Sequence, residues 1–327
     1  MDTYLLLAGG LALLILGGEL LVRGAARTAA LLGMSPLLIG LTLVGFGTSA
    51  PELVTSVEAS FMGAPGIAIG NIVGSNIANV LLILGIAAVL SPIAVGRRAL
   101  ARDGTIGLAS AVAFIAIAYL MPLDRLIGAV LVTGLALYLY FAYRQEMTGA
   151  PSAHTAAYDK REAHDEVLPG AIQATPHSSS VWPPFMLAIA GLIIVIVGGK
   201  LLVKGAVALA SSAGISETIL GLTVVAIGTS LPELVTSVIA ALRRHGDIAL
   251  GNILGSNIYN ILGIGGVTAL IAPTDVPPEI VRFDGLVMVA VSILLLVVAR
   301  TGHHISRVEG SVLLSGYGLY VYSIWPA

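Results

Sequence analysis

Two short runs in this chain of 327 residues bring together the residue types that bind cations through oxygen atoms. They are Gly47-Thr48-Ser49-Ala50-Pro51-Glu52 and Gly228-Thr229-Ser230-Leu231-Pro232-Glu233. Each run interrupts an apolar stretch, and its proline lacks a backbone donor and clashes with the preceding helical turn. Carbonyl groups just before the proline therefore lose their helical partners. Freed carbonyls, hydroxyls and one carboxylate in each run form a set of ligands made only of oxygen.

The two glutamates indicate what this set could hold. A carboxylate within an apolar span costs on the order of several kcal/mol unless it is paired or protonated. Oxygen ligands suit hard cations such as calcium and sodium, whereas zinc and copper favour nitrogen and sulfur. Glu52 and Glu233 facing each other would neutralise one divalent ion, and they could equally hold sodium ions or protons. Two cations could thus compete for one site.

A second pair of runs supplies amides and further hydroxyls, Gly70-Asn71-Ile72-Val73-Gly74-Ser75-Asn76-Ile77-Ala78-Asn79 and Gly251-Asn252-Ile253-Leu254-Gly255-Ser256-Asn257-Ile258-Tyr259-Asn260. Ser75 and Asn79 are four residues apart and share one helix face, as do Ser256 and Asn260. The glycines four apart are more typical of close helix packing than of chemistry. Asn71 and Asn252 fit either a helix cap or the site.

Composition identifies the setting of these runs. Hydrophobic residues make up 57% of the chain and charged residues 10%, against about 25% in soluble domains. So few charges could not solvate the surface of a soluble protein of this size, so we expect hydrocarbon to cover much of it. The chain has no cysteine, which excludes disulfides and thiolate metal sites, and its net charge of −2 gives no sign of a nucleic-acid partner.

Apolar stretches of about 20 residues, the length of a transmembrane helix, recur along the chain. We predict ten spans, at 4–22, 36–62, 67–90, 104–121, 124–143, 183–203, 217–241, 247–271, 283–300 and 306–325. Residues 146–182, between the fifth and sixth spans, have the composition of a mobile polar loop.

The basic residues predict the orientation of these spans. With both termini outside and the loop 146–182 in the cytoplasm, twelve of the sixteen Lys and Arg residues lie inside, as the positive-inside rule favours. The twelve are Arg23, Arg27, Arg97, Arg98, Arg102, Arg144, Lys160, Arg161, Arg243, Arg244, Arg300 and Arg307.

The paired runs belong to an internal repeat with a constant offset of 181 residues, as from Glu52 to Glu233 and from Asn79 to Asn260. Each copy holds five spans, an odd number, so the second copy must enter the membrane inverted. The expected organisation is a first five-helix repeat at 1–145, a polar loop at 146–182 and a second, inverted repeat at 183–327. Such inverted repeats are associated with alternating access to a site at the membrane midplane.

With these motifs the chain resembles the prokaryotic sodium/calcium exchangers of the cation/calcium antiporter superfamily. The resemblance covers nearly the whole chain. It implies an all-α membrane protein of ten helices, with the second and seventh broken at the ion site. It also implies calcium ligands at Glu52, Glu233, Thr48 and Thr229, and sodium ligands at Ser49, Ser230, Ser75, Ser256, the carbonyls of Gly45 and Ala226, and both glutamates. Asn79 and Asn260 would line the middle of the site.

The resemblance further implies antiport of sodium against calcium in the cell (inner) membrane, with spans one and six as the moving gate. We expect a monomer that is no enzyme and needs no cofactor. Asn260 replaces an Asp of the potassium-dependent relatives, which argues against potassium transport. A proton/calcium antiporter that uses the same glutamates stays open as an alternative, a cation channel is a weaker one, and a hydrolase would lack a base for Ser49 or Ser230.

Overall fold

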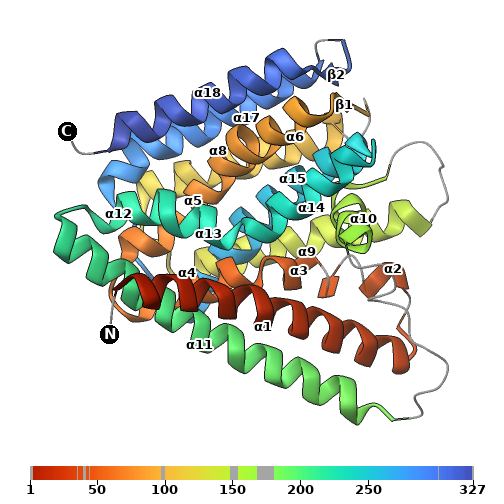
Figure 1. Ribbon diagram of the computed structural model, residues 1–327, viewed down its shortest axis with the longest axis horizontal. Helices are drawn as coiled ribbons and strands as arrows, with labels where there is room; N and C mark the ends of the chain where they lie inside the picture. Colours follow the sequence, from red (N-terminus) through yellow and green to blue (C-terminus); the bar gives the residue numbers. More distant parts are fainter. Residues whose placement is uncertain are drawn as a thin grey trace.

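The computed structural model describes residues 3–34, 36–39, 42–43, 45–96, 100–147, 154–167, 180–300 and 302–325. Parts of the second predicted span, Arg97, Arg98 and about half of the central loop (148–153 and 168–179) lie outside these residues. The described residues are mainly helical (Figure 1). Their strands are β1 (Ile93–Ala94) and β2 (His304–Ile305), an antiparallel pair in which Ile93 lies opposite Ile305.

Seven helices of the described part are long and apolar enough to cross a membrane. They are Thr3–Leu31, Pro65–Leu90, Leu100–Leu120, Arg125–Met147, Trp182–Ala213, Gly246–Ile271 and Ile280–Arg300. A bent pair, Glu217–Thr229 and Leu231–Leu242, meets at 50° and could form one more span. The chain is therefore an all-α, multi-pass membrane protein. The other two predicted spans correspond to 36–62, which is described in part, and to α18 (Arg307–Ile324).

Glycines bring two of the longest helices into close contact. Figure 1 shows α1 (Thr3–Leu31) and α11 (Trp182–Ala213) side by side along one edge of the molecule. A methyl group added at Gly10 would lie 2.5 Å from the backbone nitrogen of Leu202, and one at Gly17 would lie 2.7 Å from that of Val195. The helices run antiparallel with their backbones nearly touching, because these positions carry no side chain.

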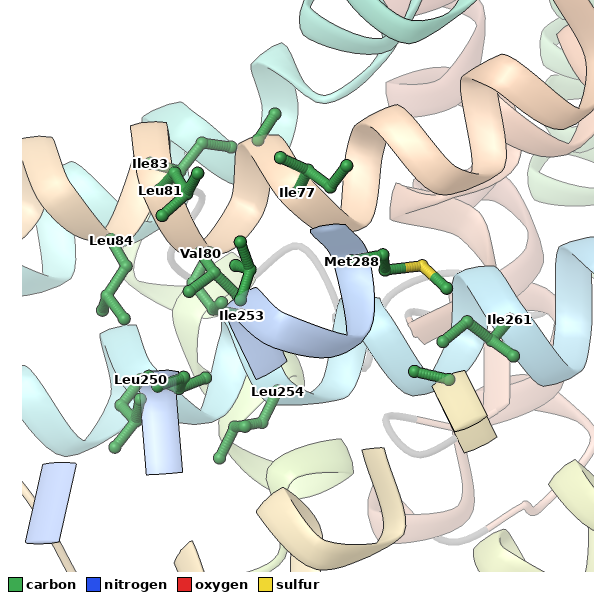
Figure 2. Packing of buried hydrophobic residues seen from close by; sticks show 14 of the residues in the cluster. Ile77, Val80, Leu81, Ile83, Leu84, Leu250, Ile253, Leu254, Ile261 and Met288 are labelled. Atoms are coloured by element: carbon green, nitrogen blue, oxygen red, sulfur yellow. The ribbon is translucent and has the colours of Figure 1, made fainter. Parts of the chain in front are cut away.

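The centre of the molecule consists of two long helices, each with a π-helical segment in its middle. One is formed by α5 (Pro65–Ala78), η2 (Asn79–Ile83) and α6 (Leu84–Leu90), the other by α15 (Gly246–Ile258), η5 (Tyr259–Gly265) and α16 (Gly266–Ile271). In each, 83% of the most apolar 18-residue stretch is buried, against 28% in α1. Figure 2 shows Val80 of one helix near Ile253 of the other, and Leu84 near Leu250.

Both halves of the chain show the same order of elements. In the first, α2 (Pro36–Ile39), α3 (Gly45–Thr48) and α4 (Ala50–Phe61) precede α5. In the second, α12 (Glu217–Leu220), η4 (Gly221–Val225), α13 (Ala226–Thr229) and α14 (Leu231–Leu242) precede α15. Further helices pack around this centre, namely η3 (Leu100–Gly104), α8 (Thr105–Leu120), α9 (Arg125–Met147), η6 (Ile280–Asp284), α17 (Gly285–Arg300) and α18.

The central polar segment contains a helix that the sequence analysis did not predict. This helix, α10 (Ala156–Val167), packs against α14 and α15. Its residues Ala156, Ala157 and Ala163 are almost fully buried, with exposed fractions of 0–1%. The described part of the predicted loop is thus folded onto the second half of the protein.

Candidate functional site

Each glutamate of the two motifs lies at the start of a half-helix. Pro51 stands in the first turn of α4 and Pro232 in that of α14, and the helix breaks at the serine just before each half-helix. Glu52 and Glu233 follow in the same first turns. The positive end of a helix dipole favours a carboxylate there. The breaks predicted from the prolines are therefore present in both halves.

Both carboxylates are buried and receive hydrogen bonds from the opposite half. The exposed fraction is 1% for Glu52 and 2% for Glu233. The hydroxyl of Ser230 donates to Glu52 Oε1 at 3.1 Å, and that of Ser49 donates to Glu233 Oε1 at 3.3 Å. The four residues of the paired motifs thus form one cluster, although 178 and 184 positions separate the bonded residues.

Several buried oxygen atoms of this region have no hydrogen-bond partner among the described residues. They include Glu52 Oε2, Glu233 Oε2, Ser75 Oγ and the side-chain oxygen of Asn260. A buried polar atom without a partner costs about 1–3 kcal/mol. Oxygen atoms left without donors, two of them from carboxylates, match the ligands that hard cations require.

The amides of Asn71 and Asn252 hold the half-helices in place. Asn71 Nδ2 donates to the carbonyl of Glu52 at 3.1 Å, and Asn252 Nδ2 lies 3.4 Å from the carbonyl of Glu233. Asn71 also accepts a hydrogen bond from Thr229 Oγ1 at 3.0 Å. Both asparagines are buried within their helices, so they do not act as helix caps. The repetition of Asn at an offset of 181 was the signal for this role.

The remaining predicted residues lie nearby with different partners. Asn79 Nδ2 donates to Asn257 Oδ1 at 2.9 Å, which the sequence analysis did not anticipate. The carbonyl of Gly45 accepts from Thr48 at 3.3 Å, and the carbonyl of Ala226 lies 3.3 Å from Thr229 Oγ1. Thr48 is half-buried, whereas Thr229 is fully buried.

Lys160, from α10, reaches the same cluster. Its Nζ donates to Glu233 Oε1 at 3.1 Å and to Ser256 Oγ at 2.6 Å, and its side chain is 0% exposed. The sequence analysis counted Lys160 among the basic residues of the inner loops. No repeat or motif in the sequence marks this lysine, so the sequence held no signal for its position.

A cavity of about 360 Å³ lies beside the site. It is lined by residues of α1, such as Gly18 and Glu19, by Thr48 and Pro232 next to the helix breaks, and by His164 of α10. The cavity thus lies where α1, α10 and the two half-helices that carry the glutamates meet.

Comparison with known proteins identifies the family. The family described as "Sodium/calcium exchanger protein" matches residues 3–144 and 184–325. The chain belongs to the sodium/calcium exchanger family. The family match leaves out the segment that contains α10.

Relatives of this family match the chain over nearly its full length. The sodium/calcium exchanger MaX1 of Methanosarcina acetivorans is 38% identical, with 96% of each chain covered. The inner membrane protein YrbG of Escherichia coli is 34% identical, with 95% of this chain and 93% of that protein covered. A solved structure of the sodium-calcium exchanger NCX_Mj is 33% identical, covers 99% of both chains and gives a TM-score of 0.63.

Proposed function

We propose that the chain is a secondary active antiporter that exchanges sodium for calcium at a site centred on Glu52 and Glu233. The observation that carries this proposal is the cluster of two buried carboxylates, each with one oxygen that has no partner among the described residues. Two negative charges balance one calcium ion, and the same oxygens can bind sodium ions in its place. Competition of the two cations for one set of ligands is what exchange requires.

The ligands are assigned on the same grounds. Calcium is bound by Glu52 and Glu233 together with the backbone carbonyls of Thr48 and Thr229. Sodium ions use the glutamates and the flanking oxygens of Ser49, Ser230, Ser75, Ser256, Gly45 and Ala226, while Asn79 and Asn260 line the middle. The crossed hydrogen bonds from Ser49 and Ser230 support this arrangement, because each serine already touches a carboxylate.

The site works within ten spans arranged as two inverted repeats, 1–145 and 183–327, joined by the cytoplasmic segment 146–182. The bend of 50° between Glu217–Thr229 and Leu231–Leu242 supports a broken seventh span. The glycine contact between α1 and α11 supports their movement as one unit, and the cavity beside α1 offers a route to the site. Both termini are outside, and the monomer is the functional unit.

Uptake of radioactive calcium into proteoliposomes tests the coupling. Purified protein is reconstituted into vesicles that are either loaded with sodium or free of sodium with an imposed pH gradient. Uptake driven by the sodium gradient is the expected result. Uptake driven only by the pH gradient would instead identify proton/calcium antiport at the same glutamates, and calcium flux that needs no counter-ion would identify a channel.

A further inference from the structure

The contacts of Lys160 are those of a bound cation. Its ammonium group is enclosed by Glu233 Oε1 at 3.1 Å and Ser256 Oγ at 2.6 Å, and it lies 5.9 Å from the centre of the Tyr259 ring. Removal of an ammonium group from water is costly unless a buried opposite charge compensates it. Glu233 supplies that charge. Both oxygens belong to residues that we assign to the transported ions, so Lys160 and an ion cannot use them together.

The N-terminal end of α10 is anchored by three hydrogen bonds to neighbouring elements. Asp103 Oδ2 accepts from the backbone N–H of Ala156 at 2.9 Å, and Glu146 accepts from that of Thr155 at 2.7 Å. Arg102 donates to the carbonyl of His154 at 2.8 Å. The helix is therefore held at a defined position, and Lys160 follows one turn after Ala156.

The docking face of α10 is a glycine face of α15. A methyl group added at Gly255 would lie 2.9 Å from the carbonyl oxygen of Ala156, and one added at Gly251 would collide with the side chain of Asp159. The first repeat offers the equivalent face on α5, at Gly70 and Gly74.

That equivalent face has a different partner. Added methyl groups at Gly70 and Gly74 would meet Gly221 and Leu222 of η4, the first part of the broken span. In the first half of the chain, the residues equivalent to Gly221 and Leu222 lie within 36–44, the segment that opens the other broken span. Its element α2 packs against α1, with Ile39 in one cluster with Val22. Of the described elements, α10 is thus the one that covers the glycine face of α15.

We propose that α10 is a built-in inhibitor whose Lys160 acts as a tethered substitute for the transported cation. The inference rests on the proposed function. The docked helix holds Lys160 on Glu233 and Ser256 and covers the glycine face of α15, so the transporter is idle. Transport requires α10 to leave, and calcium or sodium on the loop side competes with Lys160 for the same oxygens. Because the segments that join α10 to α9 and α11 are short, the effective concentration of the lysine at the site is on the order of millimolar.

Calcium dependence of transport tests this competition. Initial rates of radioactive calcium uptake into sodium-loaded proteoliposomes are measured over a range of external calcium concentrations. In the molecules whose segment 146–182 faces the outside of the vesicle, the external calcium competes directly with Lys160. Lys160→Ala should lower the half-saturating calcium concentration by roughly tenfold and leave the maximal rate near that of the wild type. The matched control is Arg161→Ala, which removes the neighbouring cation of the same helix and should keep the wild-type value.

A second pair of variants tests the docking of α10 without changing Lys160. Asp103→Ala removes the acceptor of the Ala156 N–H and should shift the half-saturating calcium in the same direction. Its counterpart Asp284, at an offset of 181, accepts a hydrogen bond from Tyr320 as Asp103 does from Tyr138. Asp284→Ala is therefore the control that loses a similar buried bond but no contact with α10.

Thiol labelling follows the departure of the helix directly, because the chain contains no cysteine. Ala163 is 0% exposed on α10. Ala163→Cys should react slowly with a maleimide in ion-free buffer and roughly tenfold faster in saturating calcium. Absence of sodium-driven exchange in the wild type and in Lys160→Ala alike would contradict the proposed function. Normal exchange with equal half-saturating calcium in the wild type, Lys160→Ala and Asp103→Ala, or labelling that ignores calcium, would contradict the inhibitor alone.

Discussion

The hydroxyl of Ser230 donates a hydrogen bond to Glu52 Oε1 at 3.1 Å, and the same bond joins Ser49 to Glu233 in the opposite direction. Each half of the chain therefore supplies a hydrogen-bond donor to the carboxylate of the other half. Neither half forms this cluster alone, because Glu52 and Glu233 each accept a hydrogen bond from the serine of the other half's motif. This relationship connects the repeat in the sequence with the chemistry of the site.

The first prediction concerns these serines. Ser230→Ala removes a hydrogen bond to a carboxylate, which is worth about 1.5–3 kcal/mol, and also removes a proposed sodium ligand. The apparent affinity for sodium should fall by roughly tenfold or more. The measurement is the sodium concentration that half-inhibits calcium uptake. Ser211→Ala, which removes an exposed hydroxyl bonded to its own helix, is the control, and an equal response of both variants would contradict the assignment.

The second prediction concerns the amides beneath the half-helices. Asn252 Nδ2 lies 2.8 Å from Ser237 Oγ and 2.9 Å from Thr236 Oγ1. Asn252→Ala leaves these buried groups without their partner and should lower the free energy of unfolding by about 1–3 kcal/mol. Thermal unfolding in detergent measures the loss, with Ser292→Ala as a half-buried control. A melting temperature equal to that of the control would show that the amide does not support the half-helix.

The third prediction concerns the contact between α1 and α11. Gly10→Leu should force the backbones apart and cost about 1–3 kcal/mol, because the backbone of Leu202 occupies the space that the new side chain needs. Gly9→Leu, one position earlier, meets nothing within 4 Å and is the matched control. Unfolding temperatures and exchange rates are compared for the two variants. Similar values for both would mean that close approach of these helices is not required.

The membrane class and the site motifs could be predicted from the sequence. Gly, Pro and Glu together within an apolar stretch have few purely structural roles. Their repetition at an offset of 181 favoured an ion site further over a packing kink. The breaks before Pro51 and Pro232 are present at the predicted positions. The pairing of Ser49 with Glu233 was not predictable, because no local rule says which half supplies a hydroxyl to which carboxylate.

The helix α10 and its lysine were beyond sequence reasoning. The segment 146–182 has the composition of a solvated loop, and a single lysine in such a loop carries no positional signal. Its position depends on tertiary contacts, namely the glycine face at Gly251 and Gly255 and the anchor at Asp103. Asn79 was expected to line the middle of the site from the family resemblance, whereas its bond to Asn257 depends on how two helices cross.

Calcium uptake by glutamine variants tests the central claim most directly. Glu52→Gln and Glu233→Gln preserve the side-chain shape but remove one of the two charges, and loss of one partner from a buried charge cluster costs about 2–5 kcal/mol. Glu58→Gln is the control, since Glu58 is half-buried and faces Lys200 at 3.9 Å. Sodium-driven calcium uptake should fall by roughly a hundredfold or more in both site variants and stay near wild type in the control. Near-normal uptake in Glu52→Gln and Glu233→Gln would contradict the account.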